Sequence, residues 1–222
     1  LGPKYNIWNK KIKYFSRTDD KIKNFYSNKK IELNSVNNLL GKKVLYLPNH
    51  FSFRRGMFKD IYPDTYLNWQ IDLMAWLKAS TGLKTLIRFH PKRLSKNFDV
   101  RENITEVHEN YNIDEADILV VDIPTTTLSY ACATSKPVIY FDIGIRKLFE
   151  NAMNEVAQRC YYTKCDINNP HPAFKNIESQ LNIKKNDNFS KVFSIGNIKT
   201  GEVDSVARHL KNEISKNKEL IE

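Results

Sequence analysis

The chain has 222 residues, of which 41% are hydrophobic and 12% aromatic, so it is long enough and apolar enough to bury a substantial core. This composition excludes an intrinsically disordered chain. The net charge of +10 fits an anionic partner such as nucleic acid, a membrane surface or a phosphorylated small molecule, although Lys residues scattered through a Lys- and Asn-rich chain explain it equally well.

Cysteine usage and hydropathy indicate the compartment. Cys132, Cys160 and Cys165 are odd in number and have neither zinc-ribbon nor redox spacing, which favours a reducing environment. The sequence contains no apolar run long enough to span a bilayer and no signal-peptide pattern. We therefore expect a soluble, cytoplasmic protein.

The first segment, residues 1–41, is expected to be a helical extension or linker. Apolar residues within 4–40 recur at roughly helical spacing among Lys and Asn, which predicts one or two amphipathic helices but no complete domain. Such helices could also belong to a missing neighbouring domain or bind a membrane surface. The main α/β domain is expected to occupy residues 42–222.

The first strand is predicted at residues 43–47 and opens into a long loop. Loops of this length inside a domain are commonly functional, and this one carries His50, Arg54 and Arg55. The two arginines either face a ligand or are simply solvated, and the sequence leaves both interpretations open. A helix follows from Asp64 or Thr65, as its cap, to about Ser80, and Gly82 ends it. Its predicted core face consists of Leu67, Ile71, Met74, Ala75 and Leu77.

A second strand is predicted at residues 85–89, and basic residues surround its end. Pro91 restricts His90 to an extended conformation at the carboxyl end of this strand. Together with Arg88, Lys92 and Arg93, His90 could bind a diphosphate, because a guanidinium binds phosphate oxygens in bidentate fashion and an imidazole can donate to them.

Residues 116–140 have the pattern of a β-α-β unit and dominate the middle of the chain. Apolar strands at 118–121 and 138–141 flank a helix, after a short strand at 104–107 and a helical turn at 114–116. Asp122 ends the first of these apolar strands and is expected to orient the turn or bind a nucleotide. The hydroxyls of Thr125, Thr126 and Thr127 either only cap the helix or, with its backbone N–H groups, also bind an anion.

The remaining elements complete a doubly wound α/β domain with a mainly parallel sheet. Asp142 follows the strand at 138–141 as another carboxylate at a strand end. His171, although it also precedes a proline, is interpreted as a surface loop residue. Helices are predicted at 146–158, 172–181, 187–195 and 202–219, the last as an amphipathic C-terminal helix, and a final strand at Tyr161 and Tyr162.

Several common sites are excluded by missing motifs. The chain has no Gly-x-Gly-x-x-Gly, P-loop, Gly-x-Ser-x-Gly or His-Glu-x-x-His pattern. The histidines are too dispersed for a metal site, and only net charge favours nucleic acid. We therefore expect no metal, no cofactor and no nucleic-acid partner.

The domain contains three short motifs: Arg88-Phe89-His90-Pro91, Ala-Asp-Ile-Leu-Val-x-Asp with its Thr turn, and Lys-Pro-Val-Ile-Tyr. Together they resemble the C-terminal, donor-binding half of a GT-B glycosyltransferase. The resemblance covers about residues 42–215 and is strongest to bacterial capsule and lipopolysaccharide enzymes. It implies a Rossmann-like half of a GT-B fold that binds a CMP-, CDP- or UDP-linked donor between Arg88 and His90 on one side and Thr125–Thr127 on the other. The catalytic base and the glycan or lipid-linked acceptor would belong to a missing N-terminal half.

Three alternatives remain. The teichoic-acid polyol-phosphate transferases are also similar, but their Ser-Ser and Arg-Gly-aromatic segments have no counterpart here. A sugar-nucleotide epimerase would need catalytic carboxylates that cannot be placed. A non-catalytic module that docks on a membrane or a partner enzyme would use only the basic surface.

Overall fold

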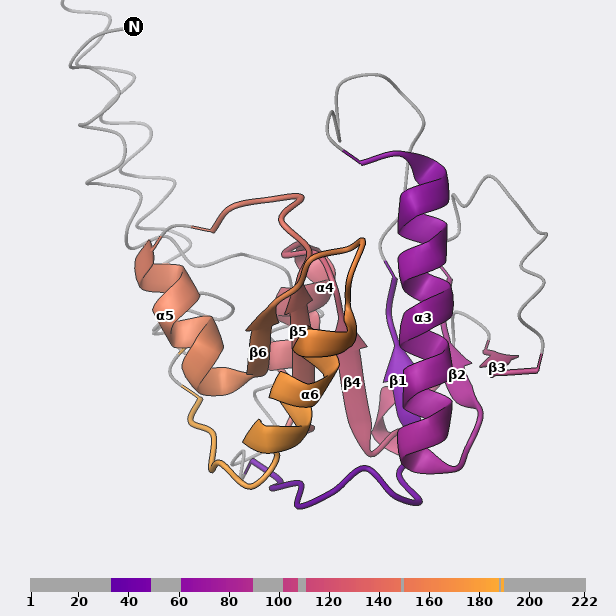
Figure 1. Ribbon diagram of the computed structural model, residues 1–222. Helices are drawn as coiled ribbons and strands as arrows, with labels where there is room; N and C mark the ends of the chain where they lie inside the picture. Colours follow the sequence, from indigo (N-terminus) through magenta and orange to yellow (C-terminus); the bar gives the residue numbers. More distant parts are fainter. Residues whose placement is uncertain are drawn as a thin grey trace, which may run out of the picture.

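Six short strands form one parallel sheet in the order β3-β2-β1-β4-β5-β6 (Figure 1). The computed structural model describes residues 33–48, 61–89, 102–107, 111–148, 150–187 and 189. The strands are β1 (Val44–Tyr46), β2 (Thr85–Ile87), β3 (Ile104–Glu106), β4 (Ile118–Val121), β5 (Val138–Asp142) and β6 (Tyr161–Lys164). Every pairing between neighbouring strands is parallel.

Helices cover both faces of this sheet, which confirms the predicted doubly wound α/β fold. They are α3 (Pro63–Thr81), α4 (Thr126–Cys132), α5 (Glu150–Arg159) and α6 (His171–Gln180), and a 3-10 turn, η2, covers Ile113–Glu115. Figure 1 shows α3 and α6 in front of the sheet and α4 behind it.

Alternating residues of the strands supply two separate cores. Ile118 and Val120 of β4 pack with α3 and α6, whereas Leu119 and Val121 pack on the opposite face with α4 and α5. All four side chains are buried, as expected for a central strand of a parallel sheet with helices on both faces. Val36 and Leu39, in the segment predicted as an extension, are buried in the α3 core.

The helix α3 begins and packs differently from the prediction. Neither Asp64 nor Thr65 caps it: Tyr62 holds the N-cap position without a side-chain hydrogen bond, and Pro63 begins the helix because its missing N–H costs nothing there. The predicted end is confirmed, since Gly82 adopts φ 73° at the C-cap. The buried face consists of Tyr66, Trp69, Gln70, Leu73, Met74 and Leu77, whereas Ala75 is exposed and Leu67 and Ile71 are only half-buried.

The other predicted elements are found with small shifts. Helix α5 begins at Glu150, not at Arg146, and α6 begins at His171, which is therefore a helical residue. No helix occurs in residues 33–41. The predicted helix at 202–219, most of the one at 187–195, and residues His50, Arg54, Arg55, His90, Lys92 and Arg93 lie outside the described residues. Within the described residues, no helix is both long and apolar enough to cross a membrane.

Candidate functional site

The strand order creates one topological switch point, between β1 and β4. From β1 the chain builds the sheet outward through β2 and β3, and from β4 it builds outward in the other direction through β5 and β6. The two connections diverge at the carboxyl ends of β1 and β4, and open α/β sheets commonly bind ligands in the crevice formed there. This edge is therefore the candidate site.

The threonine turn lies at this edge, directly after β4. Thr125 is the N-cap of α4, and its Oγ1 accepts a hydrogen bond from the backbone N–H of Thr127 at 3.3 Å. The predicted cap is thus confirmed. Thr126 is exposed and Thr127 is half-buried, so hydroxyl groups of the turn reach the surface.

Asp122 lies between β4 and this turn, but its carboxylate is directed into the core beneath α3. Oδ2 accepts hydrogen bonds from the Tyr46 hydroxyl, from the Tyr66 hydroxyl at 2.8 Å and from Nε1 of Trp69 at 3.3 Å. The residue is only 1% exposed. Its carboxylate therefore joins β1, β4 and α3 from inside the core. The sequence gives no sign of this network, whose donors lie 53 to 76 residues away.

Burial dominates the electrostatics of this network. It raises the pKa of Asp122 above 3.8, the value usual for an aspartate, although the three donated hydrogen bonds act in the opposite direction. Burial, followed by the charge of Asp122, likewise raises the pKa of Tyr46. Oδ1 of Asp122 has no hydrogen-bond partner among the described residues. A carboxyl group in this setting favours its protonated form more than an exposed one does.

Arg88 follows β2, and β1 separates it from the threonine turn. Its backbone N–H donates to the carbonyl oxygen of Tyr46 at 3.2 Å, which fixes the end of β2 against β1. The ends of β2 and β4 are thus two strand positions apart, or about 10 Å. The carboxyl end of β1 therefore lies between these two predicted binding elements.

Asp142, at the end of β5, is held by its own loop and by β6. Oδ1 accepts from the backbone N–H of Gly144 at 3.1 Å, and Oδ2 accepts from the Tyr162 hydroxyl at 3.2 Å. Gly144 has φ 79°, a conformation that favours glycine at this turn. Burial, followed by the negative charge of Asp142, raises the pKa of Tyr162. Asp142 therefore has a structural role in the strand-end turn.

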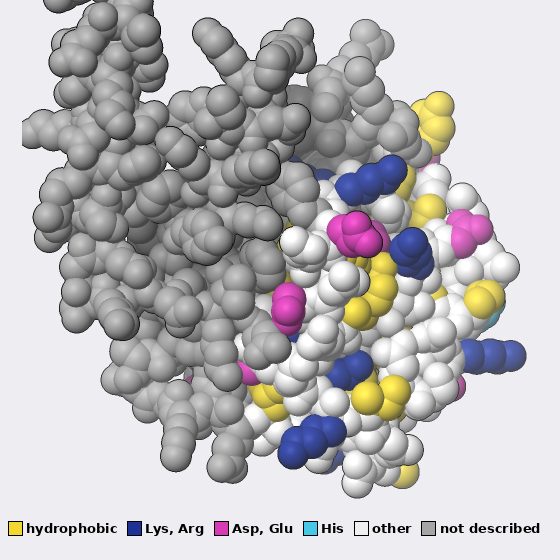
Figure 2. All heavy atoms as spheres, turned by 90° about the vertical axis from the view of Figure 1, so that its left-hand side faces the viewer, with side chains coloured by type: hydrophobic (Ala, Val, Ile, Leu, Met, Phe, Trp, Pro, Cys, Tyr) yellow, Lys and Arg dark blue, Asp and Glu magenta, His cyan; other side chains and the backbone are white. Residues whose placement is uncertain are grey.

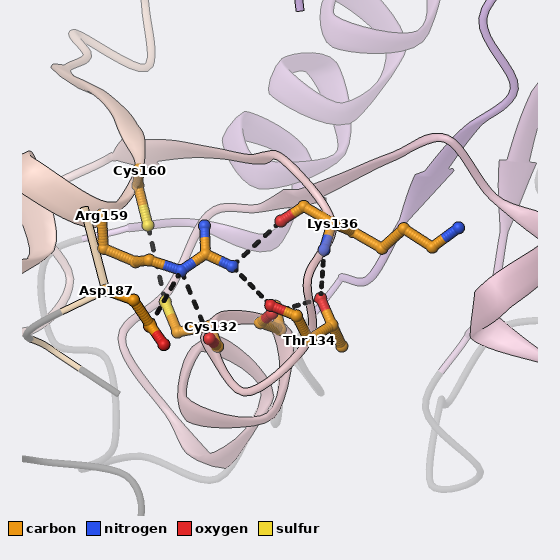
Figure 3. A network of polar contacts seen from close by, with 7 residues as sticks. Cys132, Thr134, Lys136, Arg159, Cys160 and Asp187 are labelled. Atoms are coloured by element: carbon orange, nitrogen blue, oxygen red, sulfur yellow. Dashed lines mark hydrogen bonds and ion pairs between the residues drawn. The ribbon is translucent and has the colours of Figure 1, made fainter. Parts of the chain in front are cut away.

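A second polar network lies behind the sheet, at the far end of α4 (Figure 3). The guanidinium of Arg159 is 1% exposed and donates to three backbone oxygens: those of Cys132 at 3.3 Å, Thr134 at 2.7 Å and Lys136 at 3.0 Å. Its Nε also lies 3.5 Å from Oδ1 of Asp187. Arg159 thereby satisfies carbonyl groups where α4 ends and the chain turns toward β5.

The charged side chains of the described surface are mixed in sign where they can be seen. Figure 2 shows Lys and Arg interspersed with Asp and Glu on the described part of the face it presents. Among the described residues, no three His, Cys, Asp or Glu side chains lie close enough together to hold a metal ion.

No protein-family model matches this chain, and a search of curated proteins finds no match. Function therefore has to be argued from the fold and from the residues at the switch point.

Proposed function

We propose that this domain binds the nucleotide-activated donor of a glycosyltransferase that builds a bacterial surface polysaccharide. The donor would carry CMP, CDP or UDP, and the acceptor, a glycan or a lipid-linked glycan, would be bound by another part of the enzyme. The protein would act in the cytoplasm, where nucleotide sugars are available, at the inner face of the membrane.

The topological switch point is the observation that carries the proposal. Three chain segments leave the carboxyl edge of the sheet there, after β2, β1 and β4. The first carries Arg88 and the third carries Thr125–Thr127, both within the described residues. In the sequence, His90 and Lys92 follow Arg88 after β2, and His50, Arg54 and Arg55 follow β1. This combination of cationic and hydroxyl groups suits a diphosphate.

The chemistry would be displacement at the anomeric carbon of the donor sugar. Negative charge develops on the departing phosphate, and cations and N–H donors placed near it lower the barrier. Arg88 and His90 would supply this stabilisation on one side, and the threonine hydroxyls would orient the phosphate on the other. The catalytic base is not assigned to any residue of this chain.

Isothermal titration of the full chain with CMP, CDP and UDP tests the proposal. We expect at least one of them to bind, and Arg88→Ala, His90→Ala and Thr126→Ala to weaken that binding, the two cationic changes by about tenfold or more. Lys42→Ala is the matched control, because it removes an exposed cation next to the amino end of β1, at the opposite edge of the sheet.

Two results would exclude the proposal: no binding of any of the three nucleotides by the unmodified chain, or equal affinities in all variants. Binding to anionic liposomes that is lost at high salt, without nucleotide affinity, would instead support a docking module.

A further inference from the structure

Two thiols, those of Cys132 and Cys160, lie side by side in the core behind the sheet (Figure 3). Their Sγ atoms are 3.5 Å apart, and both residues are 0% exposed. Cys132 is the last residue of α4, and Cys160 directly precedes β6. The pair therefore lies where two segments 28 residues apart in the sequence pack together.

Arg159 holds these two segments in position. It is the neighbour of Cys160, and it donates to the carbonyl oxygen of Cys132 and to those of Thr134 and Lys136. With both backbones held, a disulfide requires the sulfurs to approach by only about 1.5 Å, because a disulfide bond is ~2.05 Å long.

The surroundings distinguish the two thiols. Burial alone would raise the pKa of Cys160, but the hydrogen bond with Cys132 and the charges of Arg159 and Lys185 outweigh it and lower this pKa. Burial, reinforced by the neighbouring Cys160, raises the pKa of Cys132. The positive charges of Arg159 and Lys185 near Cys160 favour its thiolate, which is the reactive form of a cysteine.

We propose that Cys132 and Cys160 form a redox-active pair that closes to a disulfide when a hydroperoxide oxidises Cys160. With hydrogen peroxide, the Cys160 sulfur attacks one oxygen, the O–O bond breaks, and a sulfenic acid and one water result. The Cys132 sulfur then attacks the sulfenic sulfur, the S–S bond forms, and a second water leaves. Two thiols thereby lose two electrons and two protons, which the peroxide takes up. A dithiol reductant reverses the reaction.

The segment that carries Asp187 packs against Arg159 and Gln158, beside the buried pair. Among the contacts of the described residues, Asn186 bonds to Gln158 through its backbone N–H at 3.1 Å and through Nδ2 at 2.6 Å, and Asp187 pairs with Arg159 at 3.5 Å. Phe189 packs in the same core as both cysteines. Since both thiols are buried, an oxidant as small as hydrogen peroxide reaches them through local opening of this core.

Cys165 provides an internal control. Burial, followed by the charges of nearby carboxylates, raises its pKa to about 12, and its Sγ lies 3.6 Å from the carbonyl oxygen of Asp166. A thiol with so high a pKa reacts slowly with peroxide.

The sequence suits a direct peptide-mapping test. Trypsin cleaves after Lys and Arg but not between Lys136 and Pro137, so the three cysteines fall in separate peptides, residues 102–146, 160–164 and 165–175. After native oxidation of the full chain with hydrogen peroxide and alkylation of the remaining thiols, we expect peptides 102–146 and 160–164 to be joined. The thiol count measured after denaturation should fall from three to one, and dithiothreitol should restore it.

Matched variants identify the pair. In Cys165→Ser the same two peptides should be joined and the thiol count should fall from two to zero. In Cys160→Ser no joined peptides should form. Any of three results would overturn the proposal: three thiols remaining after oxidation, a link that involves Cys165, or only sulfinic and sulfonic acids at Cys160. Peptide mapping of the unmodified chain distinguishes these results even if a variant folds poorly.

Discussion

The hydroxyl oxygen of Tyr66, on α3, lies 2.8 Å from Oδ2 of Asp122 at the end of β4. The same carboxylate oxygen accepts from Tyr46 of β1 and from Trp69, one turn further along α3. One buried oxygen thus connects three elements at the switch point, and a core that depends on it is sensitive to the chemistry of this one side chain.

Asp122→Ala is expected to destabilise the protein by about 3 kcal/mol or more, because three buried donors lose their acceptor. Asp122→Asn retains an acceptor oxygen of the same shape and should cost far less. Urea unfolding of the two variants and the unmodified chain measures the difference. Equal losses in both variants would show that the hydrogen bonds to Oδ2 contribute little.

The stability contribution of Asp122 should also depend on pH. Because burial raises the pKa of Asp122 in the folded state, the folded protein binds a proton more tightly than the unfolded chain does. This contribution is fully present at pH values below 3.8, the ordinary pKa of an aspartate, and is lost as the pH rises through the folded-state pKa. As the pH rises from 3.8 through the folded-state pKa, the free energy of unfolding of the unmodified chain should fall relative to that of Asp122→Asn. A flat or rising difference in urea unfolding at a series of pH values would contradict the expectation.

Arg159→Ala should destabilise the protein by about 3–5 kcal/mol, since it removes a buried cation and leaves three carbonyl groups and Asp187 without it. Asp187→Asn is the matched comparison. It keeps the three bonds from Arg159 to backbone oxygens and should cost only about 1 kcal/mol. Chemical denaturation monitored by circular dichroism distinguishes the two losses, and a larger loss for Asp187→Asn would mean that the ion pair dominates.

Thr125→Ala is expected to cost about 1 kcal/mol through loss of the N-cap of α4, whereas Thr125→Ser keeps the accepting hydroxyl and should be nearly neutral. Hydrogen exchange of the α4 amides provides the local measurement: protection should fall in the Ala variant alone. If both variants exchange equally, the cap contributes little to α4.

The strands and the Thr125 cap could be predicted from the sequence because both depend on residues that are neighbours in the chain. Short apolar runs suffice for buried parallel strands, and a hydroxyl before a helix suffices for a cap. The buried face of α3 could not be predicted in this way. The helix offers more than one apolar stripe, and the one that is buried carries Tyr66 and Trp69, whose polar atoms reach Asp122.

The Arg159 network and the thiol pair were missed for a related reason. The partners of Arg159 include backbone carbonyls, which every residue possesses, so no side-chain pattern marks them. Cys132 and Cys160 come together only after α4, β5 and α5 have packed, and the spacing of the cysteines gives no indication of this contact. The strand order across the switch point likewise required the structure, because β1 and β4 are distant in the sequence.

That separation has a consequence for folding. The backbone N–H of Lys43 bonds to Oδ2 of Asp117 at 2.8 Å across 74 residues, beside the pairing of β1 with β4, whereas the other neighbouring strands are closer in sequence. Loop-closure entropy makes this pairing the most costly to form, so the halves β1–β3 and β4–β6 are expected to join late. The ends of β1 and β4 meet at one edge only once the two halves have joined, and the proposed nucleotide binding would therefore report completion of the sheet.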